Sequence, residues 1–327
     1  MRRLVQSLAL ICSASAAPAL ADAPTLSLPV DCTLGTSCYI EDYVDLDPGP
    51  GQRDYMCAIK SRDGHRGTDF HLLSFDAMEA GVDVLAAAPG TVDRVRDGME
   101  DIAVTPETAP DLQDRGCGNA VRIDHGDGWR TTYCHLKNGS IVVPVGAQVE
   151  AGTPLGEVGL SGLTNAPHLH LTVLKDGRVV DPFLPVDSNT TCGTVDGPGL
   201  WDAVIPYDRA GLFTAAFSDD VPSLDAVKSG DARVADMPTT SAMVLYGYVH
   251  FAEPGDLMTL WADGPDGAEV FRTQVQLDDP QLQLFRAFGR RAPAEGWAPG
   301  AYRGYVRLTR EGRVIAHRHA DLIVTSP

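Results

Sequence analysis

The feature that most constrains the fold is the texture of residues 65 to about 183, where short apolar runs alternate with turns built on glycine and proline. Short strands at regular spacing, with turn signals between them, predict an antiparallel β domain. Asp127-Gly128 and Asp176-Gly177 are the strongest hairpin signals, because Asp-Gly pairs favour tight two-residue turns. This part of the chain is therefore predicted to be mainly β, with an antiparallel barrel or sandwich architecture.

The chain of 327 residues is long enough for two domains. We expect a turn-rich segment over residues 22–56, a first domain over 57–187 and a turn-rich linker over 188–199. Residues 97–117 are polar and aperiodic, which predicts a surface insertion in the first domain. Apolar and polar residues alternate again over 200–327, and this pattern predicts a small C-terminal β-sandwich.

The N-terminus has the composition of a targeting signal. A basic "MRR" precedes an apolar stretch that ends in "ALA", so residues 1–21 are expected to be a secretory signal peptide cut after Ala21. No later window is apolar enough to cross a membrane, so no integral membrane segment is expected after signal removal. Loss of Arg2 and Arg3 would take the formal charge from −18 to −20. Nucleic acid is therefore not an expected partner, because its phosphates repel such a chain.

Six cysteines follow the signal sequence. An even number of cysteines in an exported protein predicts disulfide bonds, although six cysteines allow 15 pairings. The short spacing in "CTLGTSC" favours one local pair. We expect the following bonds: Cys32–Cys38, Cys117–Cys134 and Cys57–Cys192.

Two stretches offer candidate metal ligands. "HLH" begins an apolar run, so His168 and His170 are predicted to project from one face of a strand. In "DGHRGTDFHL" the glycines disfavour a helix, and on an extended chain His65 and Asp69 face one side with Gly67 between them. An imidazole and a carboxylate that face one gap can bind zinc, which accepts nitrogen and oxygen ligands.

A His-x-His pair alone is not specific for a metal. "HRH" places His317 and His319 at the same spacing, among arginines and without an acidic partner, so ordinary packing or solvation is favoured there. The "HLH" pair differs because its segment also contains His65, Asp69 and His135.

Three motifs, taken in order, carry a family resemblance. "HRGTD", "YCHL" and "HLH" resemble the HxxxD, Tyr-x-His-Leu and HxH motifs of the lysostaphin/LytM-type zinc endopeptidases of the cell wall. The surrounding "AAAPGTVDRV", "NAVRIDHGDGWRTTYCHL" and "VPVGAQVEAGTPLGEVGLSG" are similar to the barrel strands and turns of that family. The resemblance covers residues 57 to about 183.

The resemblance implies roles for five residues. His65, Asp69 and His170 match the three ligands of one Zn²⁺ ion, and a water would take the fourth position. Zinc in such a site lowers the pKa of its water to about 7 and polarises the scissile carbonyl. His135 and His168 match the two non-ligand histidines, which would orient the water, move its proton or stabilise the oxyanion. Which of the two is the base stays open, and simple support of the ligands is the alternative.

Three departures from the family pattern concern the approach to the metal. Ala166 stands where glycine is common, Leu171 and Thr172 follow the HxH where an aromatic residue and glutamate are common, and "SGLTNA" differs from the usual turn. None of these departures removes a ligand, but they leave the substrate preference open.

The resemblance implies a secreted zinc metalloendopeptidase that hydrolyses peptide cross-links of peptidoglycan. The substrates of the family are Gly-Gly bridges or D-Ala–diaminopimelate links. The signal peptide and the cysteines favour a periplasmic location over an extracellular one. A periplasmic location in turn favours the D-Ala–diaminopimelate link as the substrate. The alternative is a catalytically silent module that binds or activates other cell-wall hydrolases. The presence of all five histidine and aspartate positions favours the enzyme.

Two further points concern the rest of the sequence. The strands around "VLAAAPGTVDRV" also resemble carrier barrels, but those need a lysine at the hairpin tip and none occupies this turn. The C-terminal segment could bind wall polymer, a partner protein or the peptidase domain itself, and its sequence does not choose between them.

Overall fold

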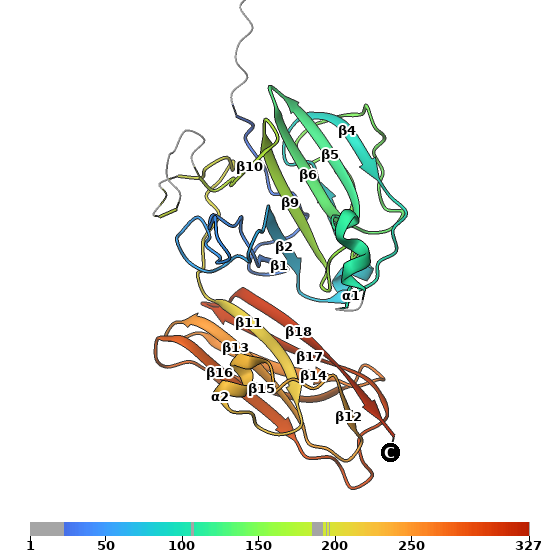
Figure 1. The fold of residues 1–327 in the computed structure, drawn as a ribbon, viewed down its shortest axis with the longest axis vertical. Coiled ribbons are helices and arrows are strands. Elements are labelled where there is room, and N and C mark those ends of the chain that lie inside the picture. The colour runs from blue at the N-terminus through green and yellow to red at the C-terminus, as the bar shows by residue number, and fades with distance from the viewer. Residues whose placement is uncertain (1–22, 106–107, 185–191, 194, 196, 327) are drawn as a thin grey trace, which may run out of the picture.

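The computed structural model describes residues 23–105, 108–184, 192–193, 195 and 197–326. It is mainly β with antiparallel sheets, as the sequence predicts (Figure 1). The expected signal peptide and much of the expected linker lie outside the described residues. Within the described part of the chain, no helix has the length and apolar character needed to span a membrane.

The larger sheet has eight antiparallel strands in the order β1-β2-β9-β6-β5-β4-β7, with β10 paired to β9. Its strands are β1 (Cys38–Ile40), β2 (Thr68–Leu72), β4 (Gly90–Arg96), β5 (Asn119–Gly126), β6 (Trp129–Leu136), β7 (Gln148–Val149), β9 (His168–Lys175) and β10 (Arg178–Val180). A smaller sheet pairs β3 (Asp83–Leu85) with β8 (Pro154–Glu157). Two short helices accompany these sheets: α1 (Phe75–Ala80) and the 3₁₀ helix η1 (Ala109–Arg115).

Both predicted Asp-Gly hairpins are confirmed. Asp127 and Gly128 join β5 to β6 with φ of 45° and 79°. Asp176 and Gly177 join β9 to β10 with φ of 50° and 78°. Two consecutive positive φ values match the right-handed twist of the strands, and aspartate and glycine tolerate them better than most residues.

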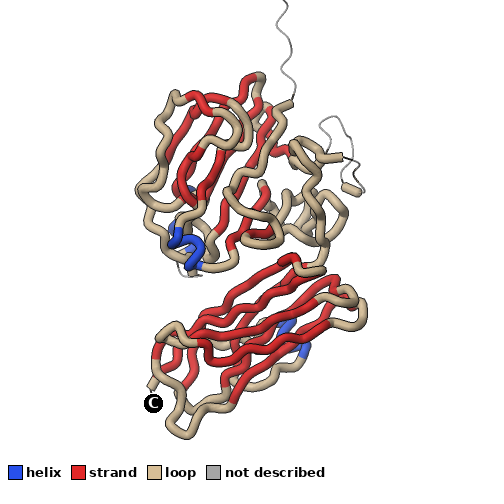
Figure 2. The backbone as a smooth tube through the Cα atoms, turned by 180° about the vertical axis from the view of Figure 1, so that it is seen from behind, coloured by secondary structure: helices blue, strands red, loops and turns tan. Residues whose placement is uncertain are grey.

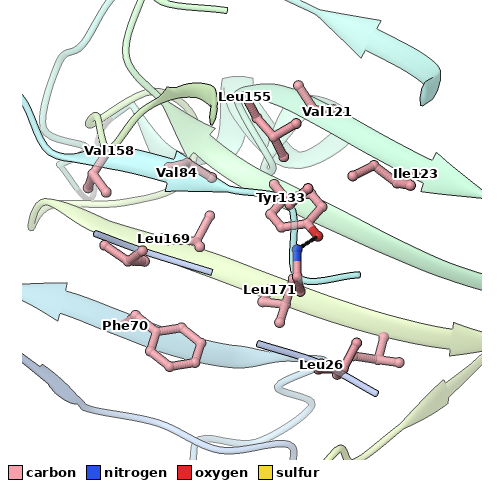
Figure 3. Packing of buried hydrophobic residues seen from close by; sticks show 14 of the residues in the cluster. Leu26, Phe70, Val84, Val121, Ile123, Tyr133, Leu155, Val158, Leu169 and Leu171 are labelled. Atoms are coloured by element: carbon pink, nitrogen blue, oxygen red, sulfur yellow. Dashed lines mark hydrogen bonds between the residues drawn. The ribbon is translucent and has the colours of Figure 1, made fainter. Parts of the chain in front are cut away.

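One face of the large sheet packs into the first hydrophobic core, while the other carries the candidate site. Phe70 of β2 and Leu169 and Leu171 of β9 are buried in this core. Figure 3 shows them beside Tyr133 of β6, whose hydroxyl accepts a hydrogen bond from the Ala87 amide at 2.7 Å. Because side chains alternate across a strand, the residues between these apolar positions point to the opposite face.

The three expected disulfides are present: Cys32–Cys38, Cys57–Cys192 and Cys117–Cys134. The segment over 22–56, expected to be rich in turns, also supplies β1 to the edge of the large sheet. Residues 97–117, expected to be a surface insertion, are mostly exposed or half-buried where described, and they include η1.

The second set of strands forms two facing sheets with their own core, which is the predicted β-sandwich. One sheet has the order β11-β13-β16 and the other β12-β18-β17-β14-β15. Its elements are β11 (Gly211–Ser218), α2 (Leu224–Ser229), β12 (Asp236–Pro238), β13 (Met243–Ala252), β14 (Leu257–Asp263), β15 (Glu269–Gln276), β16 (Gln281–Arg290), β17 (Gly300–Arg310) and β18 (Arg313–Thr325).

The sandwich packs against the end of the large sheet that carries β1, β2 and α1 (Figures 1 and 2). The Tyr39 hydroxyl of β1 donates to the His317 carbonyl of β18, and Glu41 forms an ion pair with Arg318. The ring of Phe75 in α1 meets His319 edge-on, with 5.0 Å between ring centroids. These contacts place the sandwich beside the face of the sheet that carries the candidate site.

Candidate metal centre

Two neighbouring strands place the central side chains of the site. In the antiparallel register of β2 and β9, Asp69 lies opposite His170 and His71 lies opposite His168. The residues between them, Phe70 and Leu169, face the core, so these four side chains share the other face. The predicted strand for "HLH", with both histidines on one face, is therefore present.

Three of the five predicted site residues converge on one point. His65, Asp69 and His170 each present one ligand atom, and these atoms lie within 4.8 Å of one another. His65 Nε2 is 3.2 Å from Asp69 Oδ2 and 3.1 Å from His170 Nδ1, and His170 Nδ1 is 2.7 Å from Asp69 Oδ1. Asp69 is fully buried and His65 is 6% exposed, so the group is largely shielded from solvent.

His65 lies in the loop before β2, which begins at Thr68. Its Nδ1–H donates to the Tyr43 carbonyl at 2.7 Å, which leaves Nε2 free to face Asp69. The loop is also held by Asp45, whose carboxylate accepts the Gly64 amide at 2.8 Å. A hydrogen bond of this kind to the remote nitrogen fixes the tautomer and ring orientation that a metal ligand needs.

His170 fits against Gly67 because glycine has no side chain. A Cβ at position 67 would lie 2.5 Å from the Leu171 carbonyl oxygen and 2.7 Å from the His170 ring. Across the ring, His170 Nε2 is 3.0 Å from Thr172 Oγ1. When Nε2–H donates to that hydroxyl, Nδ1 carries a lone pair toward Asp69. Thr172, a departure from the family pattern, thus orients the third predicted ligand.

Arg62 is a site residue that the sequence analysis missed. Its Nη2 forms an ion pair with Asp69 Oδ2 at 2.8 Å, and its Nη1 pairs with Asp42. Burial alone would raise the pKa of Asp69, but His65 and Arg62 lower that pKa well below its usual range. The carboxylate is therefore ionised and oriented. A basic residue close to the HxxxD motif in an acidic chain was the available signal.

His135 and His168, the two predicted non-ligand histidines, lie beside the group with their rings 4.6 Å apart. Each uses Nδ1–H to donate to a backbone carbonyl: His135 to Ser161 at 2.7 Å and His168 to Ala166 at 2.9 Å. Burial lowers the pKa of both rings, that of His135 well below its ordinary value. Both are therefore neutral near pH 7, with Nε2 unprotonated.

The backbone at His135 is unusual. Its φ is 62°, in the left-handed region that non-glycine residues rarely adopt. The Cys117 carbonyl accepts the His135 amide at 2.9 Å, and the Cys117–Cys134 disulfide joins the same two segments. Strained backbone of this kind persists where the surrounding structure fixes it, and it occurs often at functional sites.

His71 is a second residue that the sequence analysis missed. Its ring stacks on His168 with centroids 4.4 Å apart and planes 9° from parallel. His71, Asp69 and His168 form the other potential metal group among the described residues. His71 and His168 are stacked, whereas the rings of His65 and His170 meet edge to face with planes 67° apart. The position of His71, two residues after Asp69 on the same strand, was a usable signal in the sequence.

The "HRH" pair has a different environment. His317 is buried against Trp261 and Tyr305, with ring centroids 5.6 and 5.8 Å away, and burial lowers its pKa to about 3. His319 packs on Phe75 at the boundary between the sandwich and the large sheet. Both side chains have a packing role where the two sets of strands meet.

The residues present fit a zinc ion. Two imidazole nitrogens and one carboxylate oxygen are a donor set that zinc accepts, with a further position left open. His168 is 4% exposed, and its Nε2 has no hydrogen-bond partner among the described residues. A buried nitrogen without a partner is costly unless a ligand or water satisfies it. That nitrogen lies 3.7 Å from Asp69 Oδ1, beside the converging ligand atoms.

Comparison with known proteins places this site in a family. Residues 63–182 match the model of Peptidase family M23. The chain is 30% identical over 129 residues to an uncharacterised metalloprotease of Haemophilus influenzae, covering 39% of this chain and 22% of the relative. It is 32% identical over 117 residues to the peptidoglycan DD-endopeptidase ShyA of Vibrio cholerae, covering 36% and 22%. It is 38% identical over 68 residues to the murein hydrolase activator EnvC of Escherichia coli, covering 21% and 16%.

The chain thus spans about a fifth of the length of these curated relatives. The matched range holds all three converging candidate ligands and both neighbouring histidines, and the resemblance inferred from the three motifs is confirmed. Residues 63–182 of this chain belong to Peptidase family M23.

Proposed function

We propose that the chain is an exported zinc metallopeptidase that hydrolyses peptide cross-links of peptidoglycan in the periplasm. The observation that carries the proposal is the convergence of His65, Asp69 and His170 within 4.8 Å, with one unpartnered imidazole nitrogen beside them. The name of the ShyA relative, a peptidoglycan DD-endopeptidase, supports the substrate class. The expected signal peptide and the three disulfides support the location.

The site residues fall into two groups, those that would hold the ion and those that would transfer protons. His65, Asp69 and His170 would hold the ion, and Arg62 fixes the carboxylate of Asp69 by pairing with its second oxygen. Zinc in such a site acts as a Lewis acid, which activates a water and polarises a peptide carbonyl. His135 and His168 are both neutral with Nε2 unprotonated, so each can accept the proton of the attacking water and return it to the leaving amine.

The proposal is tested with the mature protein on purified peptidoglycan. We expect soluble products with new peptide termini by mass spectrometry, and one zinc per chain by elemental analysis. His65→Ala should abolish both zinc binding and hydrolysis. His125→Ala is the matched control, because His125 lies in the same domain and bonds to the Pro89 carbonyl and Thr131 instead.

Two outcomes would contradict the proposal. Unchanged digestion by His65→Ala would exclude the ligand assignment. A stable, folded wild-type protein that neither retains zinc nor releases products would instead favour the silent module. That alternative is consistent with the relative named as a murein hydrolase activator. Its test is stimulation of a separate cell-wall hydrolase by this chain.

A further inference from the structure

A cavity of about 470 Å³ lies between the M23 domain and the sandwich, and His168 lines it. Arg62 and Asn165 form part of one wall, and Phe213 and His250 of the sandwich form part of the other. Its size is typical of ligand pockets, which measure roughly 300–1,000 Å³. A second cavity of about 320 Å³ shares the following lining residues with it: Glu41, His71, Asn165, Phe213 and Arg318. The two cavities are therefore parts of one cleft, called here the interdomain cleft.

The sandwich wall of the interdomain cleft is held in place by contacts to the M23 side. Lys60 Nζ donates to the Asp208 and Ile315 carbonyls at 3.0 and 3.2 Å. The Val314 amide donates to the Gly35 carbonyl at 2.7 Å. Together with the Glu41–Arg318 ion pair, these bonds hold the first half of β18 and the segment that precedes β11. A wall fixed before the ligand arrives costs little ordering entropy on binding.

The interdomain cleft reaches His168 and Arg62, which lie beside the candidate ligand Asp69. The His168 ring stacks on His71 at 4.4 Å, and His71 contacts Tyr39 at 5.6 Å between centroids. Tyr39 in turn donates its hydroxyl hydrogen bond to the sandwich at His317. Only two rings therefore separate His168 from the sandwich. A ligand that fills the cleft beside His168 also contacts Phe213 and His250 of the sandwich.

The lining of the interdomain cleft carries both signs of charge. Lys60, Arg62 and Arg318 are cationic, and Glu41 and Asp42 are anionic. Arg62 pairs with Asp42 and Arg318 with Glu41, so the lining presents ion pairs that the ammonium and carboxylate groups of a ligand can join. A purely apolar ligand would desolvate these ion pairs without replacing their hydration.

His250 adds an unsatisfied polar group to this wall. It is 6% exposed, and its Nδ1 has no hydrogen-bond partner in the described part of the chain. Gly211 makes room for it, because a Cβ there would lie 2.5 Å from His250 Nε2. The ring of Phe213 packs against it at 4.6 Å. A buried nitrogen without a partner beside a cavity is a group that a bound ligand can satisfy.

We propose that the interdomain cleft is a substrate subsite, in which Phe213 and His250 of the sandwich contact a zwitterionic peptide segment beside the scissile bond. This inference rests on the proposed peptidase function, since it names the part of the substrate that the sandwich recognises. It gives the C-terminal sandwich a role in specificity within the same active site.

The test compares three variants of the full-length, zinc-loaded protein. Phe213→Ala and His250→Phe each remove one contact of the cleft, and His250→Phe keeps an aromatic side chain but lacks the imidazole nitrogens. Phe285→Ala is the control, because Phe285 packs in the same small cluster as Phe213 but is not among the residues that line the two cavities. Zinc content and thermal unfolding of each variant show that the metal centre and the fold are retained.

Two probes separate binding from cleavage. Calorimetry with a soluble stem tetrapeptide, which carries free ammonium and carboxylate groups, measures affinity without hydrolysis. A soluble cross-linked peptide dimer gives KM and kcat. We expect both cleft variants to weaken tetrapeptide binding and to raise KM about tenfold with kcat unchanged, as removal of one well-packed contact does. The control should match wild type, and a tetrapeptide with capped termini should bind more weakly than the free one.

The outcomes distinguish this inference from the function on which it rests. Wild-type affinity and KM in both cleft variants, faster hydrolysis by them, or no binding of the tetrapeptide to wild type would overturn the subsite. A different result separates the two proposals: wild type binds the tetrapeptide, the cleft variants bind it less well, and neither wild type nor any variant cleaves the dimer. The subsite then stands and the peptidase proposal fails.

Discussion

Gly67→Ala is the substitution whose effect on the metal centre follows most directly from the geometry. The added Cβ would lie 2.5 Å from the Leu171 carbonyl oxygen and 2.7 Å from the His170 ring. Carbon atoms in contact prefer roughly 3.5–4.0 Å, so β2 and β9 must separate by about 1 Å or the His170 ring must rotate away. Overpacking of this kind costs about 1–3 kcal/mol of stability.

The larger effect should be on the metal. Displacing His170 by about 1 Å misaligns one of the three candidate ligands. Loss of a residue that hydrogen-bonds to a metal ligand typically lowers metal affinity about 10–100-fold. We expect Gly67→Ala to lower zinc affinity by at least as much. Competition with a chromophoric chelator measures this affinity, and urea unfolding measures the stability separately.

The control for this experiment is Gly264→Ala in the sandwich. There the added Cβ would meet its nearest neighbours at 3.4–3.6 Å, which is ordinary contact. The control should retain wild-type zinc affinity and stability. Zinc affinity of Gly67→Ala within twofold of wild type would refute the argument that His170 depends on the absence of a side chain at position 67.

Three further predictions concern stability. Burial raises the pKa of Asp181 to about 7, so its contribution to stability is complete below pH 4 and is lost as the pH rises to 7. In urea unfolding at pH 8, the free energy of unfolding of Asp181→Asn should exceed that of wild type by at most about 4 kcal/mol. Equal free energies of unfolding at that pH would contradict the pKa shift. Tyr133→Phe leaves the buried Ala87 amide without its acceptor and should lose about 1–3 kcal/mol with zinc content unchanged, whereas wild-type stability would show that another acceptor replaces the hydroxyl. Replacing Cys117 and Cys134 by serine removes a disulfide that links positions 17 residues apart, which should lower the free energy of unfolding by about 3 kcal/mol and reduce activity. A variant as stable and active as wild type would show that the disulfide does not hold His135 in place.

The chemistry of the candidate site was readable because its signals are local. His168 and His170 share a strand face as a direct consequence of the two-residue period. The three motifs occur in a fixed order, and Asp-Gly dictates its own turn geometry, so the hairpins next to the site strands were also predictable. The position of His65 was less so: it lies in a loop held by Asp45, and that hydrogen bond joins residues far apart in sequence.

The residues that were missed lie close to the motifs in sequence, but their roles depend on tertiary contacts. Arg62 reaches Asp69 because the loop before β2 folds back over the strand, and its side chain gains two carboxylate partners there. His71 stacks on His168 only because β2 and β9 pair in one particular register. A slip of a single residue in that pairing would turn one set of side chains into the core.

The sequence by itself determined the fold class, the Asp-Gly hairpins and, through its ordered motifs, the five residues of the candidate site, because short-range sterics, side-chain alternation and donor chemistry are properties of the chain. Only the tertiary structure decided which nitrogen of each histidine is free, how Arg62 and Gly67 shape the ligand group, and that the C-terminal sandwich forms a wall beside His168. Those features depend on strand register and on packing between segments more than a hundred residues apart. Neither is fixed until the hydrophobic faces of the two sets of strands are buried together.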